Sequence, residues 1–86
     1  MRFRSLKMQR IYRERRVLVA ELLQNAVCAR CDAQRATEVH ELKSRARGGS
    51  ILDRDNLVAL CHDCHFWVTT HPRDAHGTGW LKKSTD

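Results

Sequence analysis

Apolar residues recur at three- and four-residue steps along the first part of the chain. Between about Leu6 and Gln24 they alternate with charged residues and occupy Met8, Ile11, Tyr12, Val19, Leu22 and Leu23. This spacing is typical of an amphipathic helix. The second half of the predicted helix, VLVAELLQ, is apolar enough to pack on the rest of the domain, whereas the first half is a basic arm. Asn25 is a suitable stop for this helix before the first pair of cysteines.

Later in the chain the pattern changes to short segments. Residues 35–42, RATEVHEL, alternate in polarity and predict a strand, and residues 57–60, LVAL, predict a second, fully apolar strand. RGGS at 47–50 is a turn signal, because its glycines let the chain reverse or approach a partner closely. Residues 61–71, CHDCHFWVTTH, predict a helix that Pro72 terminates. The predicted order is strand, glycine turn, strand, helix.

These elements predict a small α+β domain that needs a staple. We divide the chain into a basic helical arm at 1–24, a central domain at 25–80 and a tail at 81–86. There is no internal repeat. A chain of 86 residues buries little apolar surface, so something besides core packing is expected to stabilise the fold.

The charge of the chain favours a polyanionic partner. Sixteen Lys and Arg against ten Asp and Glu give a net charge of +6. Residues 1–16 alone hold +6, with Glu14 as the single acid beside Arg2, Arg4, Lys7, Arg10, Arg13, Arg15 and Arg16. A second cluster, Lys43, Arg45 and Arg47, precedes the two glycines. A charge run can also be a solvated helix face. Two basic clusters around a metal-ligand region favour nucleic acid.

Compartment and membrane association follow from what the sequence lacks. The N-terminal MRFRSLKMQRIYRERR has no apolar stretch of the length a secretory signal needs. No apolar run is long enough to span a bilayer. We therefore expect a soluble cytoplasmic protein, with no membrane partner and with its thiols reduced.

The four cysteines predict a structural zinc site. Cys28-x2-Cys31 is followed, after 29 intervening residues, by Cys61-x2-Cys64. Two such pairs suit tetrahedral coordination by four thiolates, which leaves no open position for a substrate. Zinc binding would supply the folding free energy that a small core lacks. Two disulfides or four unrelated core thiols are the alternatives, and the reduced compartment disfavours the first.

Two histidines remain between and after the second pair of cysteines. On a helix that starts near Cys61, Cys64 shares its side, His65 falls beside Cys61, and His62 points elsewhere. His65 can therefore face the first predicted strand, which carries His40. We predict a second metal between these two imidazoles.

The ordered set CARC, EVHEL, RARGGS, DNLVALCHDCH and WVTTHP resembles the four-cysteine branch of the HNH endonucleases, with their ββα-metal finger. The resemblance covers roughly residues 25–80. The small size and the basic arm are similar to free-standing HNH proteins encoded by phages, often near DNA-packaging genes. Double-stranded DNA is the implied substrate, in the host cytoplasm if the chain is phage-encoded. Terminase or portal proteins are the further partners that this resemblance suggests.

The resemblance also implies roles for individual residues. His40 matches the first position of the strand dyad and His65 the closing helix histidine, both ligands of the catalytic metal. Asn56 matches the middle Asn, whose side chain braces the loop, although an Asn at this place can also be a simple turn residue. Two positions depart from the family pattern. Glu41 replaces the general-base His, and Thr69 replaces a further helix ligand.

The role of Glu41 is open at the level of sequence. A carboxylate can accept a proton from water, yet it is a weaker base than imidazole at neutral pH. Glu41 can instead be a metal ligand with His40 nearer the base role. Adjacent side chains in a strand point to opposite faces, so one of the two can also be structural.

The implied activity is metal-dependent hydrolysis of phosphodiester bonds in DNA, by nicking or double-strand cleavage with low sequence specificity. A divalent ion (Mg²⁺, Mn²⁺ or Ni²⁺) would be held by His40 and His65. The residues expected to contact DNA are Lys43, Arg45, Arg47, Arg10 and Arg13. The alternatives are a zinc-stapled DNA-binding module whose cleavage site has decayed and a docking module of a packaging complex. His71 either replaces the ligand lost at Thr69 or caps a helix end.

Overall fold

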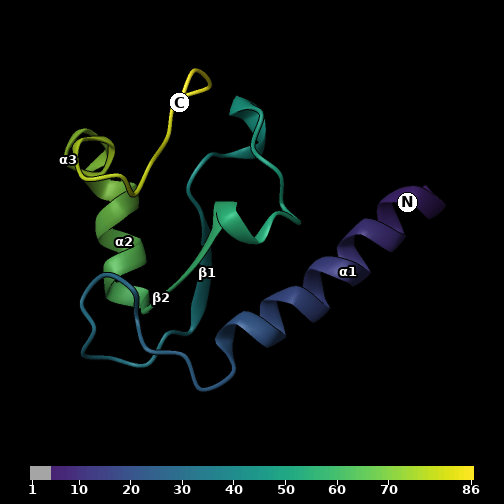
Figure 1. Cartoon of the computed structure of the whole chain (residues 1–86), viewed down its shortest axis with the longest axis horizontal. Helices are drawn as coiled ribbons and strands as arrows, with labels where there is room; N and C mark the ends of the chain where they lie inside the picture. The colour runs from purple at the N-terminus through teal and green to yellow at the C-terminus, as the bar shows by residue number, and fades with distance from the viewer. Residues whose placement is uncertain (1–4) are drawn as a thin grey trace.

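The computed structural model describes residues 5–86 (Figure 1). The helices and strands are α1 (Leu6–Leu23), β1 (Glu38–Glu41), β2 (Leu57–Leu60), α2 (His62–Thr70) and α3 (Pro72–Gly77). β1 and β2 form an antiparallel two-stranded sheet, and α2 follows β2 directly. The chain has a small α+β fold in which a long helix precedes a ββα unit, as the sequence predicts.

α1 follows the predicted amphipathic pattern. Ser5 caps it by accepting a hydrogen bond from the backbone N–H of Met8, and the helix ends at Leu23, two residues before Asn25 turns the chain at φ 54°. Leu18 is its buried residue, and the helix packs on both strands. Arg2 and Arg4 of the predicted basic arm lie outside the described residues.

The sheet is short and has a fixed register. Glu38 pairs with Leu60 and His40 with Val58, so β1 occupies only the middle of the predicted segment 35–42. Because side chains alternate along a strand, Glu38 and His40 share one face of β1. The sheet formed by the described residues has two strands, so each strand keeps one edge free of strand pairing.

The loop between the strands contains two short 3-10 turns, η1 (Arg45–Arg47) and η2 (Arg54–Asn56). Gly48 ends η1 with φ 92°, a conformation that glycine adopts without strain. A Cβ atom on Gly49 would lie 1.8 Å from the carbonyl oxygen of Lys43. The two glycines are therefore needed for the backbone conformation and the close packing of this loop.

The segment after α2 differs from the prediction. Pro72 ends α2 as expected, but it is also the first residue of α3, a position where its fixed φ suits a helix. α3 includes His76. From α3 the chain returns to β1, where the backbone N–H of Lys82 donates to the carbonyl of Leu42 at 2.7 Å. The end of the chain thus closes over the strand that carries His40.

Three of the four cysteines belong to the core. The largest fully buried side chains are Leu60, Val68 and Cys28, and the same cluster contains Cys61, Cys64 and Ala75. Half of the residues in this cluster are therefore cysteines.

Among the residues that the structure describes, no helix has both the length and the apolar character for crossing a bilayer.

Candidate metal centres and active site

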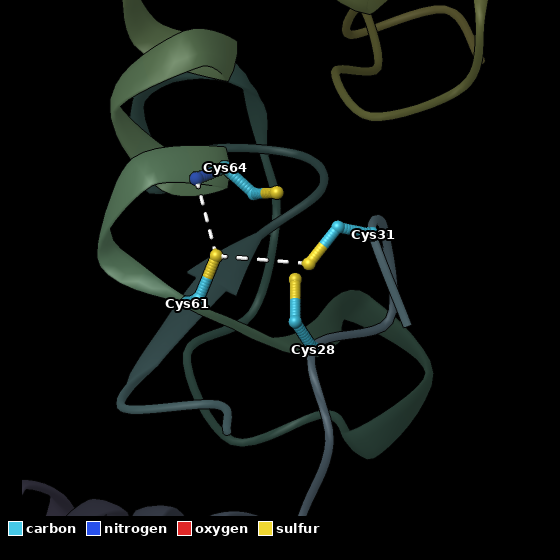
Figure 2. A group of neighbouring side chains, drawn as sticks. All are labelled: Cys28, Cys31, Cys61 and Cys64. Carbon is cyan, nitrogen blue, oxygen red and sulfur yellow. Dashed lines mark hydrogen bonds between the residues drawn. The ribbon is translucent and has the colours of Figure 1, made fainter. Parts of the chain in front are cut away.

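The sulfur atoms of the two Cys-x2-Cys pairs converge on one point (Figure 2). All four Sγ atoms lie within 4.8 Å of one another. Cys28 and Cys31 come from the turn after α1, whereas Cys61 caps α2 and Cys64 lies in its first turn. A metal held by these four cysteines would therefore link the beginning of the central domain to the start of α2.

The spacing and chemistry of this cluster fit zinc. In a tetrahedral site with Zn–S bonds of about 2.3 Å, the sulfur atoms lie about 3.8 Å apart. Cys31 Sγ lies 4.0 Å from Cys61 Sγ. All four cysteines are free of disulfides. Four thiolates fill the coordination shell, so the role of this site is structural.

Backbone N–H groups prepare part of the cluster for a metal. Burial raises the pKa of Cys28, but backbone hydrogen bonds, led by that of Cys31, outweigh it and lower the pKa to about 6. The N–H of Ala33 lowers the pKa of Cys31 in the same way. Burial raises the pKa of Cys64 to about 12. A cation at the centre is what allows all four to be thiolates together.

Arg30 covers one side of the cysteine cluster. Its Nη1 donates to Cys64 Sγ at 3.4 Å, and its guanidinium carbon lies 3.7 Å from the centroid of the Trp67 ring. The ring of His71 stacks on the same tryptophan, with the ring centroids 5.2 Å apart and the planes at 12°. A cation next to four thiolates offsets part of their negative charge.

His40 and His65 form a close pair. Their ring centroids lie 5.1 Å apart with the planes at 63°. A cation bound at about 2.1 Å from a ring nitrogen lies about 3.2 Å from the ring centroid, so two ligands at 90–110° have centroids about 4.5–5.2 Å apart. The observed separation falls within this range. The predicted pair from β1 and α2 is thus brought together.

The hydrogen bonds of the two rings set their tautomers. His40 Nε2 donates to the carbonyl of Trp80 at 2.6 Å, and His65 Nδ1 donates to Glu38 Oε1 at 2.6 Å. In the neutral rings this leaves the lone pairs of His40 Nδ1 and His65 Nε2 for a metal. Burial lowers the pKa of His40, which favours the neutral ring.

Glu38 joins two histidines of α2. Its second oxygen, Oε2, accepts a hydrogen bond from His62 Nδ1 at 2.7 Å. The hydrogen bond from His62, followed by that from His65, lowers the pKa of Glu38, and the same carboxylate raises the pKa of His62. His62 is exposed, as expected, but it is bonded to the carboxylate that orients His65.

The two histidines lie beside a cavity of about 320 Å³. Its lining includes Val39, His40 and Glu41 from β1, His65 from α2 and Arg15 from α1. His40 and Glu41 therefore border the same space although they are adjacent in a strand. This is possible because the cavity follows the end of β1, where residues of both strand faces reach it.

Asn56 connects the two ends of the loop between the strands. Its Oδ1 accepts from the backbone N–H of Lys43 at 2.8 Å, and its Nδ2 donates to the carbonyls of Lys43 and Ser50, both at 2.9 Å. Lys43 follows β1 by two residues, so these bonds hold the chain just after His40 and Glu41. The side chain is a brace rather than a simple turn residue.

The basic residues expected at DNA lie in different surroundings. Lys43 Nζ donates to the carbonyl of Asp86 at 2.8 Å, and Arg45 Nη1 donates to the hydroxyl of Tyr12 at 3.2 Å. The second contact joins the two basic clusters of the sequence. Residues on the exposed surface are Arg10, Arg13 and Arg47.

Thr69 and His71, at the end of α2, do not line the cavity beside His40 and His65. His71 caps α2, its Nδ1 lies 3.1 Å from the carbonyl of Trp67, and its ring stacks on that tryptophan, so it takes the capping role. Thr69 borders a smaller cavity of about 230 Å³ with Glu38, His62 and His65. Its hydroxyl donates to the carbonyl of Phe66 at 2.9 Å.

The sequence model of the HNH endonuclease family matches residues 27–69, which are 43 of the 86 residues. The chain belongs to the HNH endonuclease family. The matched range includes both cysteine pairs, the two strands and most of α2. No curated protein and no solved structure matched the chain. The four-cysteine cluster is consistent with a zinc-type HNH domain.

Two side chains near the histidine pair were not among the predicted site residues. Glu38 was treated as part of an alternating strand, although its position two residues before His40 placed it on the same face. Arg15 was counted only in the charge of the basic segment. Its helical position, four residues after Ile11 and four before Val19 of the apolar stripe, was the available signal that it faces the domain.

Proposed function

We propose that this chain is a metal-dependent DNA endonuclease and that hydrolysis takes place in the cavity beside His40 and His65. The observation that carries the proposal is the 5.1 Å separation of the two rings at that cavity. Each ring has one nitrogen engaged by a protein acceptor and the other nitrogen left for a ligand. Membership of a nuclease family supplies the reaction class.

The residues that would hold the second ion are His40 and His65, whose imidazoles suit several divalent metals. When bound, such an ion stabilises negative charge on the phosphate and on the departing oxygen. Glu38 keeps His65 in the required tautomer, and the carbonyl of Trp80 does so for His40. The cysteine site fixes the first turn of α2 and, with it, the place of His65.

Glu41 has two candidate roles at this cavity. As a base it would accept a proton from the attacking water, and as a ligand it would add an oxygen to the two imidazoles. Glu41→Gln separates them, because the amide is a poor base but keeps an oxygen that can bind an ion, whereas the imidazole of Glu41→His can serve in either role. If both variants keep full activity, Glu41 has neither role.

DNA would approach along the surface that joins α1 to the loop after β1. Arg45 and Arg47 would contact phosphates beside the metal, with Arg10 and Arg13 extending the contact along α1. Contacts of this kind read the backbone and not the bases, so weak sequence preference is expected. Binding should also weaken as salt rises.

A plasmid-relaxation assay tests the proposed activity. Zinc-loaded protein is assayed with added Mg²⁺, Mn²⁺ or Ni²⁺, and metal analysis counts zinc separately from the exchangeable ion. His40→Ala should abolish nicking while the protein keeps its zinc and its DNA affinity. His76→Ala is the matched control, because His76 lies in α3 and is not among the residues that line the cavity.

The outcome also separates the alternatives. Retention of DNA without cleavage under every ion would instead support a zinc-stapled binding module. If the isolated chain neither cleaves nor retains DNA, the result would favour a module that works only with a protein partner.

A further inference from the structure

Arg15 differs from the other basic residues of α1. The remaining four are exposed to solvent: Lys7, Arg10, Arg13 and Arg16. The side chain of Arg15 is only 21% exposed and reaches the cavity that His40 and His65 border. A guanidinium placed in this way is positioned by the fold and is not part of a solvated helix face.

Two groups from the ββα unit hold the Arg15 side chain. Nη1 donates to the carbonyl of Ile51 at 2.7 Å, and Nη2 lies 3.5 Å from Glu41 Oε1. Ile51 belongs to the loop between the strands, and Glu41 is the last residue of β1. A single side chain of α1 thus contacts the end of β1, which lines the candidate active site, and the loop between the strands.

We propose that Arg15 is a phosphate-binding residue of the hydrolysis site and that it exchanges Glu41 for a phosphate oxygen when DNA enters the cavity. The proposal rests on the proposed endonuclease function. It assigns α1 a part in the reaction site, beyond general attraction of the polyanion. It also links the open role of Glu41 to the arrival of substrate.

The two contacts of Arg15 differ in a way that permits the exchange. A charge-assisted N–H···O hydrogen bond is about 2.7–2.9 Å long, so the bond to Ile51 is fully formed whereas the 3.5 Å approach to Glu41 is a loose ion pair. A guanidinium has five N–H donors and matches a phosphate in a two-pronged contact. Arg15 can therefore stay anchored through Nη1 while Nη2 turns to the substrate.

The exchange has a consequence for Glu41. While DNA is absent, the carboxylate is occupied by Arg15. Once the guanidinium moves to the phosphate, Glu41 is free to accept a proton from water or to bind the ion, whichever of its two candidate roles applies. The phosphate, rather than Glu41, then neutralises the arginine.

Single-turnover cleavage by saturating enzyme tests this assignment. Arg15→Gln is compared with Arg16→Gln, which removes the same charge from the neighbouring, exposed position of the helix. We expect Arg16→Gln to weaken DNA binding but to keep the saturated rate within about twofold of the wild type. Arg15→Gln should lower the saturated rate by about 10²-fold or more, the effect of losing one preorganised donor to a developing charge. Arg15→Lys should recover only part of it.

Thermal unfolding and zinc content identify a merely structural role. If Arg15 only anchors α1, Arg15→Gln lowers the melting temperature while the saturated rate of the folded protein stays at the Arg16→Gln level, and the proposal is overturned.

A second measurement does not require cleavage. In zinc-loaded protein without the second ion, the Arg15 Nε–H resonance, assigned by its loss in Arg15→Lys, should shift when a short duplex is added. A resonance that does not respond to bound duplex overturns the phosphate contact even if the wild type cleaves. If the resonance shifts but the wild type cleaves plasmid under none of the added divalent ions, the contact is supported and the endonuclease function is refuted instead.

Discussion

The carboxylate of Glu38 on β1 accepts a hydrogen bond from Nδ1 of His65 on α2, at 2.6 Å across the gap between strand and helix. This bond fixes the ring of His65 and leaves Nε2 for a cation. Residues that orient a metal ligand in this way contribute to metal affinity.

Glu38→Gln should therefore weaken binding of Mn²⁺ or Ni²⁺ at the second site by about 10–100-fold. Calorimetric titration of zinc-loaded protein measures the affinity directly. Glu14→Gln, which removes an exposed acid from α1, is the control and should leave the affinity unchanged. Equal affinities in wild type and Glu38→Gln would contradict the orienting role of the carboxylate.

Local patterns predicted the framework of this HNH domain well. The helical period located α1, the apolar run LVAL located β2 to the residue, and the CxxC spacing identified the four sulfurs that converge. α3 was missed because Pro72 was considered only as the end of one helix. The same fixed φ also begins the next helix, and local sequence does not say which role applies.

The tertiary contacts of the site were beyond local patterns. Arg15 meets Glu41 and Ile51 across 26 and 36 positions of sequence (41 − 15 and 51 − 15), and that approach depends on how α1 packs on the sheet. The helical wheel placed His62 away from His65, yet one carboxylate with two oxygens reaches both. The association with terminase or portal proteins stays a prediction.

The pKa values of His62 and His40 should be shifted in opposite directions. Glu38 raises the pKa of His62 above its ordinary 6.5, while burial lowers the pKa of His40 below it. NMR titration of zinc-loaded protein should show both shifts. Glu38→Gln should return His62 to its ordinary value and leave His40 low, since burial is the main cause there. A His62 pKa that stays raised in Glu38→Gln would refute the pairing.

The ion pair between His62 and Glu38 also predicts how the stability of the fold depends on pH. A raised histidine pKa adds stability that is fully present below pH 6.5 and is lost as the pH rises through the raised value. A lowered carboxylate pKa adds stability that is present above pH 4.5 and is lost as the pH falls through the lowered value. The pair between His62 and Glu38 should therefore stabilise most between pH 4.5 and 6.5. Thermal unfolding of wild type and His62→Gln should differ most in this window.

The loop after β1 should tolerate no side chain at its second glycine. A Cβ atom on Gly49 would lie 1.8 Å from the carbonyl oxygen of Lys43 and 2.9 Å from Asn56 Nδ2. Gly49→Ala should destabilise the protein by about 3 kcal/mol, because the backbone has to move and the bonds of the Asn56 brace are disturbed. Gly77→Ala is the matched control, since a Cβ there meets no atom within 4 Å. Denaturant unfolding measures both, and equal effects would contradict the close approach.

The contact between Arg30 and Cys64 should slow the loss of zinc from the cysteine cluster. Arg30 donates to the sulfur at 3.4 Å and is held in place over the ring of Trp67. Replacing it by glutamine removes a positive charge next to four thiolates, so zinc transfer to a chromogenic chelator should become several times faster. Arg35→Gln removes the same charge from an exposed position and should change the transfer rate little. If both variants release zinc at the same rate, net charge alone governs the release and the specific contact does not.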